Sequence, residues 1–270
     1  MSRDNEAFMP ADMIRRVLDS ATPDVVLVGG QALAYWMAVF GIHQPDGVEP
    51  AISRDVDFFA IDAANVAPLT RFARAIGGRR HLERIESLSA LIGSAIAPAD
   101  DDRIYNVDLI QQVVGIDRAE VEKHAVEVRL PGENGTLRVL HPVHVLQSRN
   151  ANLHKLPEKQ DAIGSLQYRL AIDVARAYLE RRIDAIQVRP DLDADARERA
   201  VFDAIRRVVA YASEDAAKKN AERYGIHLAD AIPAWRIESS AFWEKQWPHL
   251  RKRMSEGYAH ECERRHRSAR

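Results

Sequence analysis

Two glycines follow a short apolar run in residues 25–33, which read VVLVGGQAL. The run at 25–28 is rich in β-branched residues and carries no charge, which is typical of a buried β-strand. Gly29 and Gly30 end this strand, and residues 32–40 (ALAYWMAVF) predict a helix packed on most of its sides. The order strand, Gly-Gly, helix lets backbone N–H groups approach a phosphate, although many tight turns use glycine for backbone freedom alone.

An Asp-Val-Asp motif lies on the next predicted strand, residues 55–61 (DVDFFAI). Asp55 and Asp57 are two apart, so both side chains leave the same face of a strand. They repel each other unless a cation or a proton compensates, although solvated carboxylates at strand ends are also common. A third carboxylate, Asp108, lies on the apolar strand predicted at 104–110 (IYNVDLI). If the two strands are neighbours, the three carboxylates converge and suit a hard cation such as Mg²⁺.

Sequence patterns divide the chain into two parts. Strand and helix signals alternate in residues 1–140, and helical periodicity dominates residues 141–270. We therefore expect an α+β protein, with an N-terminal α/β domain built on a mixed sheet and a C-terminal helical bundle. The remaining elements are expected as helices at 9–20, 66–76, 143–152, 165–183 and 196–212 and as strands at 90–96, 125–130 and 136–140.

The composition is that of an ordinary globular protein, with 46% hydrophobic and 29% charged residues among 270. The balance of 38 basic and 40 acidic residues excludes a protein that coats nucleic acid through its overall charge. One cysteine, Cys262, excludes a disulfide within the chain and a cysteine-rich zinc site. The N-terminus lacks a secretory h-region, and the uncharged run 25–42 contains several glycines and has no basic anchor, so we expect a cytoplasmic protein without membrane contact.

Together the motifs resemble the nucleotidyltransferase superfamily with the DNA polymerase β-like fold. The resemblance rests on residues 28–33 (VGGQAL), 53–58 (SRDVDF) and 106–109 (NVDL). The chain is similar to the AbiEii-like branch, which includes toxins of abortive-infection and toxin–antitoxin systems. In that branch a helical domain follows soon after a sheet strand, as residues 139–146 (VLHPVHVL) do here.

The resemblance implies an Mg²⁺-dependent or Mn²⁺-dependent enzyme that transfers a nucleoside monophosphate from an NTP to a hydroxyl acceptor and releases pyrophosphate. RNA such as tRNA, a protein and a small molecule all remain open as acceptors, and a toxin would also have an antitoxin partner. Asp55 and Asp57 would bind the metal ion that bridges the phosphates. Asp108 would complete a second metal site and help deprotonate the attacking hydroxyl.

The resemblance also implies a set of nucleotide-binding residues. These are Gly29, Gly30 and Gln31 at the diglycine bend, Ser53 and Arg54 before the acidic motif, and Arg149, Asn152 and Lys155 on the helix after Pro142. The last three recur at i, i+3 and i+6 and form either a phosphate contact or a solvated polar face. Arg54 is either a phosphate ligand or a solvated surface arginine.

Two other functions remain open at the level of sequence. One is a catalytically impaired protein on the same fold that binds a nucleotide or a partner. The long interval between Gly30 and Asp55 favours this alternative, whereas three intact carboxylates argue against it, because a binding module does not need such a costly cluster. The other is a phosphohydrolase that uses the same metal ions, but the sequence contains no His-Asp pair of the kind that positions water.

Overall fold

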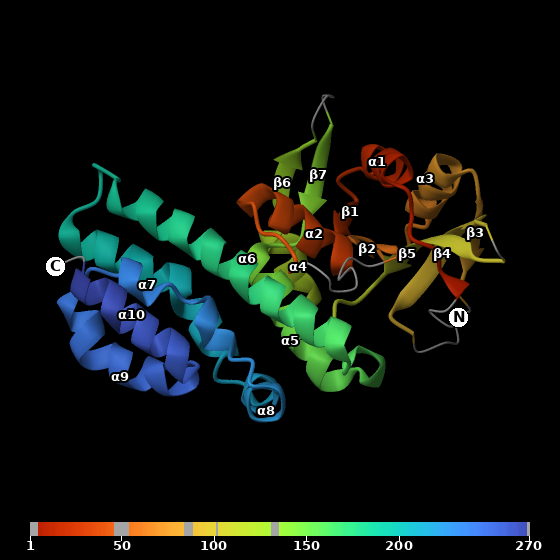
Figure 1. The fold of residues 1–270 in the computed structure, drawn as a ribbon. Coiled ribbons are helices and arrows are strands. Elements are labelled where there is room, and N and C mark those ends of the chain that lie inside the picture. The colour runs from red at the N-terminus through yellow and green to blue at the C-terminus, as the bar shows by residue number, and fades with distance from the viewer. Residues whose placement is uncertain (1–4, 46–53, 84–88, 101, 131–134, 269–270) are drawn as a thin grey trace. The chain divides into compact units, whose positions relative to one another are not determined.

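The computed structural model describes residues 5–45, 54–83, 89–100, 102–130 and 135–268, and its elements are shown in Figure 1. The chain forms two compact units. Unit 1 contains Met1–Tyr35 and Gly47–Val145, and unit 2 contains Trp36–Asp46 and Leu146–Arg270. The unit boundaries fall inside two helices, α2 (Gly29–Phe40) and α5 (Pro142–Lys155), so each of these helices contributes residues to both units.

Unit 1 is built on a mixed sheet, which in the described residues has seven strands in the order β3-β4-β5-β2-β1-β7-β6. The pairs β2·β5 and β1·β7 are parallel, and the other neighbours are antiparallel. The predicted α+β class with a mixed sheet is therefore confirmed. The strands are β1 (Val25–Leu27), β2 (Val56–Ala60), β3 (Arg79–Leu82), β4 (Leu91–Pro98), β5 (Ile104–Ile110), β6 (Val126–Arg129) and β7 (Thr136–Val139).

One face of this sheet is covered by α3 (Ala67–Ile76), which is amphipathic and ends where Gly77 takes the left-handed conformation with φ 67°. Phe72 of α3 stacks on Phe58 of β2 with ring centroids 4.5 Å apart, and both side chains are fully buried. Because strand side chains alternate, Asp57, the neighbour of Phe58, leaves the opposite face of the sheet. The packing of α3 thus orients the acidic face away from the apolar core.

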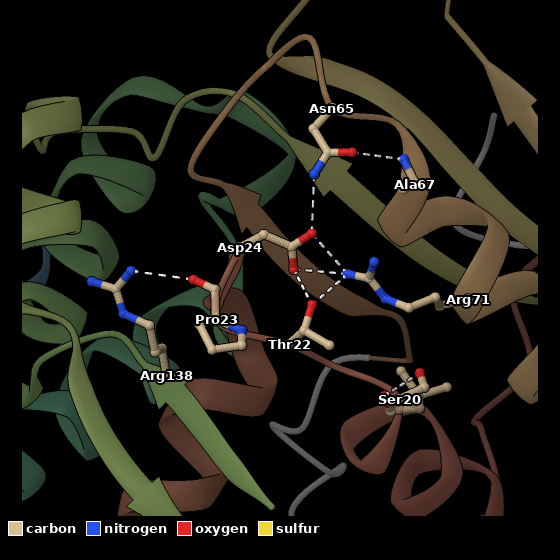
Figure 2. Close-up of polar contacts among 9 residues, drawn as sticks. Ser20, Thr22, Pro23, Asp24, Asn65, Ala67, Arg71 and Arg138 are labelled. Atoms are coloured by element: carbon tan, nitrogen blue, oxygen red, sulfur yellow. Dashed lines mark hydrogen bonds and ion pairs between the residues drawn. The ribbon is translucent and has the colours of Figure 1, made fainter.

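A polar cluster joins the turn after α1 (Ala11–Asp19) to α3, as Figure 2 shows. The Arg71 guanidinium donates to both carboxylate oxygens of Asp24, at 2.7 and 2.9 Å. Thr22 and Asn65 also donate to this carboxylate. Burial opposes the ionisation of Asp24, but the hydrogen bonds from Arg71 and Thr22 outweigh it, so the pKa of Asp24 is lowered. The Asp24–Arg71 ion pair therefore ties the residue before β1 to α3 through charge-assisted hydrogen bonds.

Unit 2 is helical in its described residues. The centre of its core is α6 (Ala162–Gln187), whose inward residues include Leu170, Val174 and Leu179. None of the helices in the described part of the chain combines the length and the apolar character that a membrane span needs. The other α-helices of the described residues are α4 (Arg118–His124), α7 (Ala194–Tyr211), α8 (Asp215–Tyr224), α9 (Trp247–Leu250) and α10 (Glu256–Ser268). Short 3-10 helices lie at Pro157–Lys159, Leu228–Ala231, Ala234–Arg236 and Arg251–Arg253, and a π-helical stretch lies at Phe242–Gln246.

The structure corrects two predicted boundaries near the acidic motif. The helix predicted at 32–40 begins at Gly29, so both glycines belong to its first turn. The strand predicted at 55–61 begins at Val56, so Asp55 lies in the bend before β2. Each shift changes the surroundings of a predicted site residue.

Candidate metal centre

Three carboxylates converge on the sheet face opposite α3. The strands β2 and β5 pair in parallel, and their register places Asp57 directly beside Asp108. Asp55 joins them from the bend before β2, and one ligand oxygen of each residue lies within 4.8 Å of the others. The expectation that the two strands are neighbours is confirmed. Within the described ranges, this is the one group of three or more His, Cys, Asp or Glu side chains that converges so closely.

Two neighbouring side chains fix the carboxylate of Asp108. Ser94 of β4 pairs opposite Asp108, and its Oγ donates to Asp108 Oδ1 at 2.6 Å. Asn106, two residues earlier on β5, donates from Nδ2 to the same oxygen at 3.0 Å. Both donors are buried, each with 7% of its surface exposed. Since both donors contact Oδ1, the second oxygen, Oδ2, is the one left for a cation.

The electrostatics of the centre favour a bound positive charge. Burial raises the pKa of the Asp108 carboxyl, and the negative charge of Asp55 raises it further. The hydrogen bonds from Ser94 and Asn106 act in the opposite direction and do not cancel this rise. A divalent cation would relieve the repulsion, and carboxylate oxygens are the ligands that Mg²⁺ and Mn²⁺ prefer. The residues present therefore fit such an ion.

The diglycine bend lies directly against this centre. Gly29 has φ 65°, a conformation that favours glycine, and a Cβ built on it would lie 1.9 Å from Asp57 Oδ2. Only a residue without a side chain allows the carboxylate to come so close to the backbone. Gly30 and Gln31 follow in the first turn of α2, where N–H groups have no acceptor within the helix. The acidic centre and a helix start that suits an anion are thus adjacent.

Arg54 lies beside Asp55 in the same bend, and the structure shows what holds it. Its Nη1 donates to the carbonyl oxygen of Glu6 at 3.4 Å, and its guanidinium carbon lies 5.0 Å from the ring centroid of Phe8. Arg54 is half-buried, and neither the phosphate contact nor the solvated surface position is decided by these contacts, so both stay predictions. Ser53, also predicted to touch phosphate, lies outside the described residues.

The three polar residues predicted on the helix after Pro142 all belong to unit 2 and do not share one solvated face. Arg149 is buried and donates to Gln167 Oε1 at 2.9 Å. Asn152 is half-buried and Lys155 is exposed. The solvated-face interpretation therefore fails for Arg149, and the phosphate contacts of the three residues stay predictions.

Sequence reasoning did not find the residues that support Asp108. Asn106 shares a strand face with Asp108, a signal visible in the spacing alone. Ser94 could be found only through the register of β4 on β5. No pattern indicated Glu6, whose Oε1 accepts from Asn106 Nδ2 at 3.4 Å.

Comparison with known proteins adds no assignment. No family model matches the chain, and no curated protein is significantly similar to it.

Proposed function

We propose that the protein is a divalent-metal-dependent nucleotidyltransferase that transfers a nucleoside monophosphate from an NTP to a hydroxyl acceptor. The observation that supports this function best is the contact between two features distant in sequence. Gly29, at the start of α2, lies directly against Asp57, which converges with Asp55 and Asp108. Phosphoryl chemistry needs both a cation site and a place for the anionic phosphates, and this pair of features offers both.

The three carboxylates have overlapping roles in this proposal. Asp55 and Asp57 would hold the cation, and Asp108 would complete the metal site through Oδ2 and also help to deprotonate the acceptor hydroxyl. When bound, the ion would offset the negative charge that accumulates on the phosphate oxygens. The first turn of α2 would receive the triphosphate through the N–H groups of Gly29 and Gly30.

Asp108 is the candidate acceptor of the proton that the reaction releases. The hydroxyl oxygen of the acceptor attacks the α-phosphorus and forms a new P–O bond. The P–O bond between the α-phosphorus and the β-phosphate oxygen breaks, and pyrophosphate leaves with the electron pair. The proton of the hydroxyl passes to the carboxylate of Asp108, which lies beside the other two carboxylates of the metal centre.

The test uses each of the four NTPs labelled at the α-phosphate, with Mg²⁺ or Mn²⁺ and with total RNA, total protein and a small-molecule extract as acceptors. We expect label to pass to one acceptor fraction and pyrophosphate to appear in equal amount. Asp57→Asn should abolish transfer, while Asp117→Asn should not, because Asp117 is exposed and does not cap α4 through its side chain.

Two results would contradict the proposal. Transfer that survives in Asp57→Asn would show that the acidic centre is not the site. Metal-dependent NTP binding without transfer to any fraction would instead assign a nucleotide-binding protein on this fold.

A further inference from the structure

Residues 5–9 lie along the beginning of β5. Glu6 forms a parallel bridge with Ile104, and the backbone N–H of Ala7 donates to the carbonyl oxygen of Ile104 at 2.9 Å. Ala7 and Met9 are buried, whereas Phe8 between them is 45% exposed. The backbone contacts with Ile104 anchor this segment on the sheet. Because side chains alternate along an extended segment, those of Glu6 and Phe8 lie on the other side from those of Ala7 and Met9.

The segment is also fixed from the side of the acidic motif. Arg54 donates to the backbone oxygen of Glu6 and lies over the ring of Phe8. Glu6 is thus held both by β5 and by the residue that precedes Asp55. The backbone of Glu6 therefore has a defined position beside the acidic motif.

The Glu6 carboxylate faces an amide that itself contacts the metal centre. Asn106 Nδ2 lies between two carboxylates, 3.4 Å from Glu6 Oε1 and 3.0 Å from Asp108 Oδ1. The other end of this amide, Asn106 Oδ1, is buried and has no hydrogen-bond partner in the described part of the chain. A flipped amide would set its oxygen against both carboxylates, so the two acidic groups together determine which end of Asn106 faces Asp108.

We propose that Glu6 is a positioning residue of the metal centre, which acts through Asn106 to keep Asp108 Oδ2 available to the cation. The inference rests on the metal site of the proposed function but does not require that the protein transfers nucleotides. Glu6 does not belong to the converging group of carboxylates. Its effect passes through the hydrogen bond that orients Asn106, and partners of this kind typically tune metal affinity.

The test is the affinity of the full chain for Mn²⁺, measured by isothermal titration calorimetry without nucleotide. Glu6→Ala should weaken Mn²⁺ binding about threefold to tenfold, less than the roughly tenfold to hundredfold loss typical of direct partners of metal ligands, because Glu6 acts one hydrogen bond further out. Glu6→Gln retains a carbonyl oxygen that can accept from Asn106 and should stay within about twofold of the wild type. Asn5→Ala, at an exposed neighbour in the same segment, is the matched control and should bind as the wild type does.

A double-mutant cycle separates a positioning role from a general effect on the fold. If Glu6 acts through Asn106, then Glu6→Ala should cause no further loss in an Asn106→Ala background. Equal losses in both backgrounds would overturn the proposal. An equal loss in Glu6→Gln and Glu6→Ala would overturn it as well, because the charge alone would then explain the effect.

The readout distinguishes this proposal from the proposed function. Wild-type protein that binds Mn²⁺ and shows the predicted cycle, but transfers no nucleotide, would support the positioning role and reject the enzyme. Transfer activity together with an unchanged Mn²⁺ affinity in Glu6→Ala would reject the positioning role alone. Absence of Mn²⁺ binding in the wild type would reject the metal centre and this inference with it.

Discussion

If the acidic centre serves to bind a cation, its three carboxylates should lower the stability of the fold when no ion is bound. Replacement of Asp108 by asparagine tests this expectation. Asparagine has nearly the same shape, and its Oδ1 can still accept from Ser94 and Asn106. The substitution removes a half-buried carboxylate, and burial together with the negative charge of Asp55 raises the pKa of that carboxyl group. Without a cation, Asp108→Asn should therefore be more stable than the wild type at neutral pH.

The magnitude follows from the spacing of the carboxylates. Their ligand oxygens lie within 4.8 Å of one another. At an effective dielectric constant of 20, two charges at this distance repel by roughly 3 kcal/mol. These side chains are only partly buried, so screening by solvent reduces the expected gain to about 1–2 kcal/mol. For a chain of this size that corresponds to a rise of about 2–6 °C in melting temperature.

The assay is thermal unfolding of wild type, Asp108→Asn and the control Asp117→Asn, with and without Mn²⁺. At about 100 times its Kd, Mn²⁺ should stabilise the wild type by about 2.7 kcal/mol. It should stabilise Asp108→Asn much less, since one ligand has lost its charge. The advantage of the variant should disappear as the pH falls through the raised pKa of Asp108, because the wild-type carboxyl then becomes neutral. A variant that melts below the wild type at neutral pH in the absence of metal would refute the reasoning.

Three further predictions follow from other contacts. Gly29→Ala should cost about 1–2 kcal/mol more stability than Gly77→Ala in chemical denaturation, because both glycines have positive φ but only the first would clash with a carboxylate. Ser94→Ala should weaken Mn²⁺ binding about tenfold in calorimetry, and an unchanged affinity would contradict its role. Arg71→Ala should cost about 1 kcal/mol at pH 7. Because the pKa of Asp24 is lowered, the difference in stability between wild type and Arg71→Ala should persist above about pH 4 and shrink as the pH falls through the pKa of Asp24 in the folded protein. A stability difference that stays constant with pH would exclude the ion pair as its cause.

Local patterns were sufficient to predict the elements that carry the acidic centre. The apolar run of β1 and the sequence of β5 have the β-branched and alternating character of strands, and β5 lies at the residues predicted. The convergence of Asp108 with Asp55 and Asp57 depended on a strand pairing that no local signal specifies. It could be stated only as a condition, which the pairing of β2 with β5 meets.

Other features could not be predicted, for identifiable physical reasons. The edge strand β3, with the sequence RRHL, is exposed throughout and so lacks any apolar alternation. Glycine has a low helix propensity, so the local pattern did not predict that α2 begins at Gly29. The need for glycine at this position comes from the close approach of Asp57, which only the fold brings about. Glu6 lies about a hundred residues from Asn106, and only the folded sheet brings the two together.

The most direct test of the metal centre is anomalous diffraction at the manganese edge from crystals grown with Mn²⁺ and a non-hydrolysable NTP. The account predicts a peak within about 2.2 Å of carboxylate oxygens of Asp55, Asp57 and Asp108, the coordination distance of such ions, with the triphosphate at the first turn of α2. A nucleotide bound elsewhere, or manganese peaks that avoid these three carboxylates, would contradict it.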